Sequence, residues 1–123
     1  MLEKVLIFNC SGDVKALINR TLLPLKVRLV FVEKEDYSKP LGVLAGLSGI
    51  IGEDTASDYP EISDTMIVFA FFGDKKLNSA LSALKKAGLN LPYKAVLTDE
   101  NKLWPANKCF NEIKQEHEKL NNR

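Results

Sequence analysis

Four short apolar segments, separated by segments with helical character, constrain the fold of this chain more than any other feature of its sequence. The longest apolar run, residues 66–72 (MIVFAFF), contains no polar side chain, which is typical of a strand covered on both faces. Each apolar run is followed by apolar residues at helical spacing or by a proline where a helix would begin. The predicted strands are residues 5–8, 27–32, 66–72 and 93–98, and the predicted helices are residues 12–23, 40–47, 74–88 and the segment after Pro105.

This alternation predicts an α/β fold with three layers, in which a four-stranded, mostly parallel sheet lies between flanking helices. Right-handed connections and the apolar character of residues 5–8 and 66–72 place these two strands in the middle, which gives the order 2-1-3-4. Residues 1–123 are expected to form a single domain, and the sequence shows no internal repeat or linker. An α+β fold with one antiparallel strand stays open as the alternative, because the helix predicted for residues 40–47 is short.

The composition excludes several classes of partner and site. Seventeen basic and sixteen acidic residues give a formal net charge of +1, so neither nucleic acid nor an anionic membrane surface is expected as a partner. Cys10 and Cys109 lie far apart and His117 is the only histidine, so no disulfide, metal site or cofactor is predicted. No apolar run approaches the roughly 20 residues that span a bilayer. The first residues are typical of a strand rather than a signal peptide, and a cytoplasmic protein is expected.

The expected topology also predicts where a site would lie. In an open α/β sheet, ligands bind beyond the carboxyl ends of the strands, near the point where the strand order reverses. With the order 2-1-3-4, the loops at that point are residues 9–13 and 72–74, flanked by residues 33–42 and 98–104. We therefore expect most of the polar residues of interest on one rim of the sheet.

The loop after the first strand (NCSGD) combines a thiol, a hydroxyl and a carboxylate. Ser11 or Asp13 is suited to capping the first helix, and Asp74 to capping the third. Neither loop has the glycines of a dinucleotide-binding motif or the Lys and Ser/Thr of a P-loop. Since a helix N-terminus lowers the pKa of a nearby thiol, a small enzyme that uses Cys10 or Asp74 stays open as an alternative.

Three segments of the chain, residues 33–42, 77–86 and 93–104, share a recognisable pattern, with motif positions at Pro40, Leu41, Gly42, Lys94, Thr98, Asn101 and Trp104. Together they resemble a small bacterial family that is known only as domain of unknown function 3783. The likeness extends over nearly the whole chain and is strongest from residue 66 onward. It implies no activity, because none is established for the family. Where the family pattern continues from Trp into Thr or Ser, this chain has Pro105.

The sequence favours a non-enzymatic binding or regulatory module whose ligand, a small polar molecule or a protein, contacts the carboxyl-end rim of the sheet. This interpretation expects a shallow cleft with the side chains of Asn101 and Trp104 turned to solvent, and it assigns no catalytic residue. Self-association through the apolar residues 41–51 stays open as well. The predicted ligand-binding residues are Pro40, Gly42, Thr98, Asn101 and Trp104.

Overall fold

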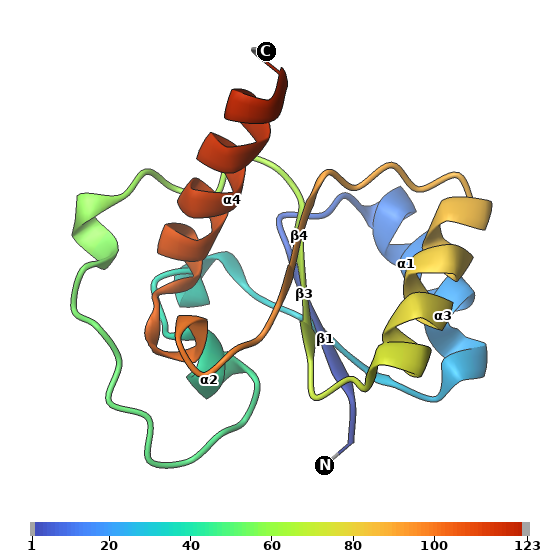
Figure 1. Cartoon of the computed structure of the whole chain (residues 1–123), viewed down its shortest axis with the longest axis horizontal. Helices are drawn as coiled ribbons and strands as arrows, with labels where there is room; N and C mark the ends of the chain where they lie inside the picture. Colours follow the sequence, from blue (N-terminus) through green and yellow to red (C-terminus); the bar gives the residue numbers. More distant parts are fainter. Residues whose placement is uncertain (1, 122–123) are drawn as a thin grey trace.

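The computed structural model describes residues 2–121, which form one four-stranded sheet with helices on both faces (Figure 1). Strands and helices alternate along the chain as the sequence predicts. Short 3-10 turns, among them η2 (Lys34–Asp36) and η4 (Asn101–Leu103), follow the two edge strands. The elements are β1 (Lys4–Phe8), α1 (Gly12–Leu22), β2 (Arg28–Phe31), α2 (Leu41–Leu44), β3 (Met66–Ala70), α3 (Asp74–Lys86), β4 (Tyr93–Val96) and α4 (Ala106–Asn121).

The sheet has the order β2-β1-β3-β4, which confirms the predicted order. The outer pairs, β1 with β2 and β3 with β4, are parallel, whereas the central pair of β1 and β3 is antiparallel. The sheet is thus mostly parallel, and it also contains the antiparallel pairing that the alternative anticipated. For two strands to run parallel, the connection between them must carry the chain back to the edge where the first strand began, usually through a helix. The connection from β2 to β3 contains two 3-10 turns and the single α-helical turn of α2, and the chain enters β3 from the opposite edge.

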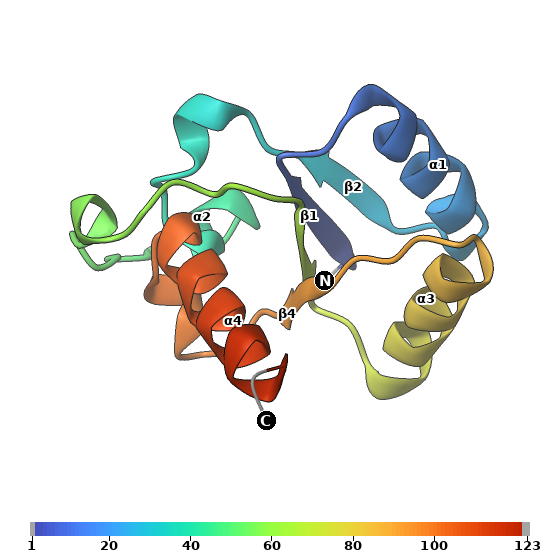
Figure 2. The same ribbon diagram turned by 90° about the horizontal axis from the view of Figure 1, so that it is seen from above.

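The helices cover the two faces in pairs, with α1 and α3 on one face and α2 and α4 on the other (Figures 1 and 2). Successive side chains of the central strands point to opposite faces, and both faces are covered. This is why residues 5–8 of β1 and all of β3 are apolar. On the first face the core includes Val5, Ile7, Ile18, Leu22, Ile67, Phe69, Ala80 and Leu84, and on the second Leu6, Phe8, Leu41, Met66, Val68, Ala106 and Phe110.

The two halves of the chain repeat the same arrangement about the centre of the sheet. Each half contains a central strand, a helix, a parallel edge strand, a 3-10 turn and a second helix. The central register is symmetric, because Lys4 pairs with Ala70, Leu6 with Val68 and Phe8 with Met66. The fold therefore has an approximate two-fold relation that the residue types do not reveal.

A second contact between the halves follows the same symmetry. Pro40 and Pro105, which stand equally far along the chain from the ends of their edge strands, form an isolated antiparallel bridge. The amide of Leu41 donates to the carbonyl of Trp104 at 2.9 Å, and the amide of Ala106 donates to the carbonyl of Lys39 at 3.0 Å. We call these joined segments, residues 39–42 and 104–106, the proline joint.

Candidate functional site

The antiparallel central pair divides the predicted rim between two opposite edges of the sheet. Phe8, the last residue of β1, pairs with Met66, the first residue of β3. The loop of residues 9–13 therefore lies at one edge, and the loop of residues 72–74 lies at the other. The expectation of one common rim is wrong for this reason, and Cys10 and Asp74 do not lie in one site.

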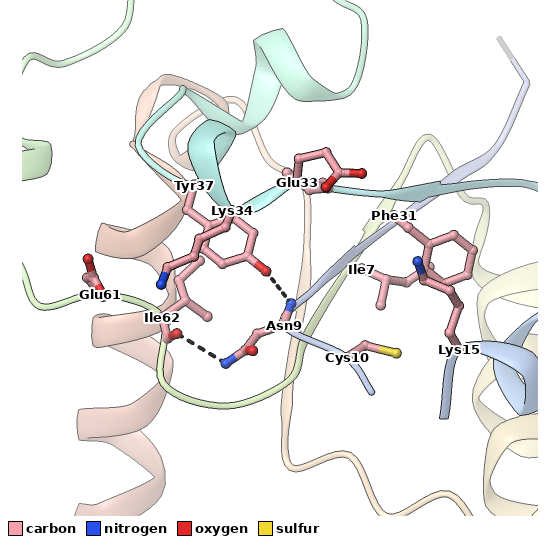
Figure 3. A pocket seen from close by; sticks show the side chains of 11 residues that line it. Ile7, Asn9, Cys10, Lys15, Phe31, Glu33, Lys34, Tyr37, Glu61 and Ile62 are labelled. Carbon is pink, nitrogen blue, oxygen red and sulfur yellow. Dashed lines mark hydrogen bonds between the residues drawn. The ribbon is translucent and has the colours of Figure 1, made fainter. Parts of the chain in front are cut away.

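At the first edge, the carboxyl ends of β1 and β2 open into a cavity of about 380 Å³, which we call the β1–β2 hollow (Figure 3). Its lining is largely polar and comes from the loop after β1, from α1, from η2 and from the segment before β3. Figure 3 shows Lys34 and Glu61 on one side of Asn9, and Lys15 with Phe31 on the other. The polar side chains of the lining include Asn9, Lys15, Glu33, Lys34, Tyr37 and Glu61.

Asn9 holds the walls of this hollow together. Its φ angle of 55° lies in the left-handed region, which Asn tolerates better than most residues. Its backbone amide donates to the Tyr37 hydroxyl at 2.6 Å, and its side-chain Nδ2 donates to the carbonyl of Ile62 at 3.2 Å. The hydroxyl of Thr65 donates to the carbonyl of Asn9 at 2.8 Å. The sequence placed residues 9–13 and 33–42 at the expected rim, but it did not single out Asn9 or Tyr37 as a binding residue.

The Cys10 thiol at this hollow is not activated. It donates to the carbonyl of Ser11 at 3.3 Å, and burial raises its pKa, with a smaller opposing effect from the charge of Lys15. The Lys15 ammonium lies 4.8 Å from the centre of the Phe31 ring. Since a reactive thiol needs a lowered pKa, the surroundings of Cys10 do not favour nucleophilic chemistry.

Of the predicted helix caps, Ser11 is confirmed, because its hydroxyl accepts from the amide of Val14 at 3.5 Å. Asp74 is the first residue of α3 rather than its cap, and the cap position is taken by Gly73 without a side-chain hydrogen bond. Residues 2–121 contain no group of three or more His, Cys, Asp or Glu side chains that could hold a metal ion.

Thr98 and Asn101 bind each other rather than facing outward together. The Asn101 Oδ1 accepts from the Thr98 amide at 2.8 Å, and the Asn101 amide donates to the Thr98 hydroxyl at 3.0 Å. The Asn101 Nδ2 donates to the carbonyl of Val96 at 3.0 Å. Asn101 is only 9% exposed, which contradicts the expectation that its side chain turns to solvent. These contacts close the turn after β4.

The remaining predicted residues belong to the proline joint. A Cβ atom on Gly42 would lie 2.9 Å from the carbonyl oxygen of Lys102, so this position has no room for a side chain. Trp104 is half-buried against the core, and the Lys108 ammonium lies 4.8 Å from its ring centre. Trp104 and Asn101 also border a groove beside α4, so the structure brings the predicted residues close together. Their contacts join the halves of the fold.

The second edge carries a counterpart of the β1–β2 hollow with different chemistry. A cavity of about 430 Å³ opens at the carboxyl ends of β3 and β4. Phe71, with a φ of 69°, stands where Asn9 stands in the first half, and Phe72 follows it as Cys10 follows Asn9. This cavity, the β3–β4 hollow, has an aromatic wall where the first has an amide.

These features define a small α/β domain with a mixed sheet, two related halves and a polar hollow in the first half. Residues 65–120, which span the second half from β3 through most of α4, match the model of the family described as "Domain of unknown function (DUF3783)". The resemblance read from the sequence is confirmed over these residues, although the match does not extend to residues 1–64. No curated protein and no solved structure matches the chain. In residues 2–121, no helix is long and apolar enough to cross a membrane.

Proposed function

We propose that the protein is a non-enzymatic binding module that holds a small polar ligand in the β1–β2 hollow. The observation that carries this proposal is a cavity at the carboxyl ends of two parallel strands, lined in part by polar groups that the fold does not itself use. The residues first predicted to bind a ligand have most of their polar groups engaged within the fold. We therefore propose the ligand site at the turn after β1 rather than at the turn after β4.

The lining of the hollow supports recognition rather than catalysis. The Tyr37 hydroxyl accepts a hydrogen bond from Asn9 and keeps its own hydrogen for a ligand acceptor. Lys15 and Lys34 offer positive charge, and Glu33 and Glu61 are exposed carboxylates. A mixture of donors and acceptors around a small cavity favours a polar ligand with both kinds of group.

The alternative, an enzyme that uses Cys10 or Asp74, gains no support from the contacts of either residue. The Cys10 thiol has a raised pKa, and the described residues place no histidine beside it as a base. Asp74 lies at the opposite edge and is exposed.

The proposal is tested by titrating the ¹⁵N-labelled protein with small acids, amines, amino acids and nucleosides. Binding in the β1–β2 hollow shifts the amide resonances of Asn9, Lys34 and Tyr37, and the bound compound is recovered unchanged. The variant Lys15→Met weakens binding, whereas the matched exposed variant Lys75→Met does not. Shifts confined to residues 98–104, or conversion of the compound by the protein, would overturn the proposal, as would the absence of any shift in the hollow.

A further inference from the structure

Asn107, near the start of α4, has a side-chain oxygen without a partner. The residue is only 7% exposed, and its Oδ1 is the buried side-chain atom among the described residues that lacks a hydrogen bond. Its Nδ2 faces the carbonyl oxygens of Ala56 (2.8 Å), Tyr59 (3.3 Å) and Pro60 (3.5 Å). Three carbonyl acceptors fix the nitrogen on that side, so the amide cannot be turned to satisfy its oxygen. A buried acceptor without a partner is unfavourable, and a ligand donor would satisfy it.

Asn107 borders a smaller cavity of about 220 Å³, which we call the side hollow. Four of its lining residues, Lys34, Tyr37, Glu61 and Ile62, also line the β1–β2 hollow, so the two cavities are neighbours. The side chains of Lys34 and Glu61 are exposed and belong to surface segments. The Asn107 oxygen is itself buried, so a ligand group would reach it only if side chains at the side hollow moved aside, which the exposure of Lys34 and Glu61 permits.

The side hollow combines acceptors with one cation. Glu61 and Lys34 line it with a carboxylate and an ammonium group, and Asn107, whose buried oxygen is an unused acceptor, borders it. An α-amino acid carries an ammonium and a carboxylate on the same carbon atom, so both groups fit within one small cavity of this kind. Its side chain would then extend into the β1–β2 hollow, toward Asn9 and Lys15.

We infer that the ligand is an α-amino acid whose ammonium group donates to the Asn107 Oδ1 and the Glu61 carboxylate, and whose carboxylate pairs with Lys34. This inference rests on the proposed function and adds the class of ligand to it. Free amino acids and the free N-terminal residue of a peptide share the ammonium group. Only the free amino acid presents the adjacent carboxylate that Lys34 would bind.

The test is an NMR titration of the full chain with the common free amino acids, followed by matched analogues of the tightest binder. For glutamine these analogues are glutaramic acid, which lacks the amino group, 4-aminobutanamide, which lacks the carboxylate, and glutaminylglycine, a peptide. The amino acid is expected to shift the side-chain NH₂ resonances of Asn107 and to bind at least tenfold more tightly than each analogue. The variant Glu61→Gln weakens binding of the amino acid at least tenfold, and so does Lys34→Met.

The control is Asp99→Asn, which changes an exposed carboxylate at the β3–β4 hollow and leaves binding unchanged. Equal binding of an amino acid and its deaminated analogue, with shifts at Asn9 and Lys34 but none at Asn107, would overturn the inference and leave the proposed function standing. A peptide that binds as tightly as the free amino acid overturns the assignment of Lys34. Shifts at none of these residues with any probe would overturn the proposed function as well.

Discussion

Substituting Asn101 by alanine separates a structural role from a ligand-binding one. The substitution removes the acceptor of the Thr98 amide and the donor to the Val96 carbonyl, at 2.8 and 3.0 Å. Each hydrogen bond of this kind contributes a net 0.5–1.5 kcal/mol or so, and a buried group left without a partner costs at least as much. The free energy of unfolding is therefore expected to fall by about 1–3 kcal/mol.

The measurement is urea unfolding followed by circular dichroism, since fluorescence of the nearby Trp104 would report local changes. The matched control is Asn78→Ala on the exposed face of α3, where alanine favours the helix and the free energy of unfolding stays level or rises by a few tenths of a kcal/mol. The reasoning is refuted if Asn101→Ala leaves the unfolding curve unchanged. If the same variant abolished ligand binding, Asn101 would return as a site residue.

Three further predictions follow from the packing and from the two thiols. Gly42→Ala places a Cβ atom 2.9 Å from the Lys102 carbonyl oxygen and is expected to lower the free energy of unfolding by about 1–3 kcal/mol. The control Gly12→Ala has open space around the new Cβ atom and is expected to be neutral or stabilising by up to about 1 kcal/mol. Urea unfolding of both variants decides this, and equal stabilities would contradict it. In the variant Cys109→Ala, the rate at which Cys10 reacts with iodoacetamide is expected to rise with pH, with a midpoint above the free-thiol pKa of about 8.5, because burial raises the pKa of Cys10. A midpoint below that value would restore the enzyme hypothesis. Burial raises the pKa of Cys109 to about 12, so the unfolded chain loses this proton first and stability falls as the pH rises above about 8.5. Between pH 8.5 and 9.5, the free energy of unfolding should fall less steeply with pH in Cys109→Ala than in the unchanged chain, and the two slopes should differ by up to about 1.4 kcal/mol per pH unit. Parallel slopes would contradict a raised pKa for Cys109.

The strands and their order were predictable because burial on both faces leaves a direct record in the sequence. Residues 66–70 are apolar at every position and lie at the centre, while the edge strand at residues 93–96 alternates in burial. The direction of β3 left a weaker record: the shortness of the helix predicted for residues 40–47, which kept an antiparallel strand open as the alternative. It depends on the path of residues 45–65, a segment without a regular apolar pattern.

The candidate site was harder to predict, since sequence does not distinguish a polar side chain that binds the fold from one that binds a ligand. Asn101 and Asn107 are both buried, yet Asn101 uses its oxygen and Asn107 does not. That difference depends on the position of a few carbonyl groups far along the chain. Asn9 and Tyr37 stood in segments expected at the rim, residues 9–13 and 33–42, but nothing in the sequence distinguished them from their neighbours.

The two-fold relation makes this chain comparable to a dimer whose subunits are fused through residues 45–65. In a dimer of identical subunits, a substitution that suits one cavity is imposed on both. In the fused chain the two cavities vary independently, and Asn9 and Phe71 show the result at one backbone position with one left-handed conformation. The family match covers residues 65–120 and so omits β1, the strand that pairs with one side of β3. Here the first half supplies that strand, and its own loops are free to specialise.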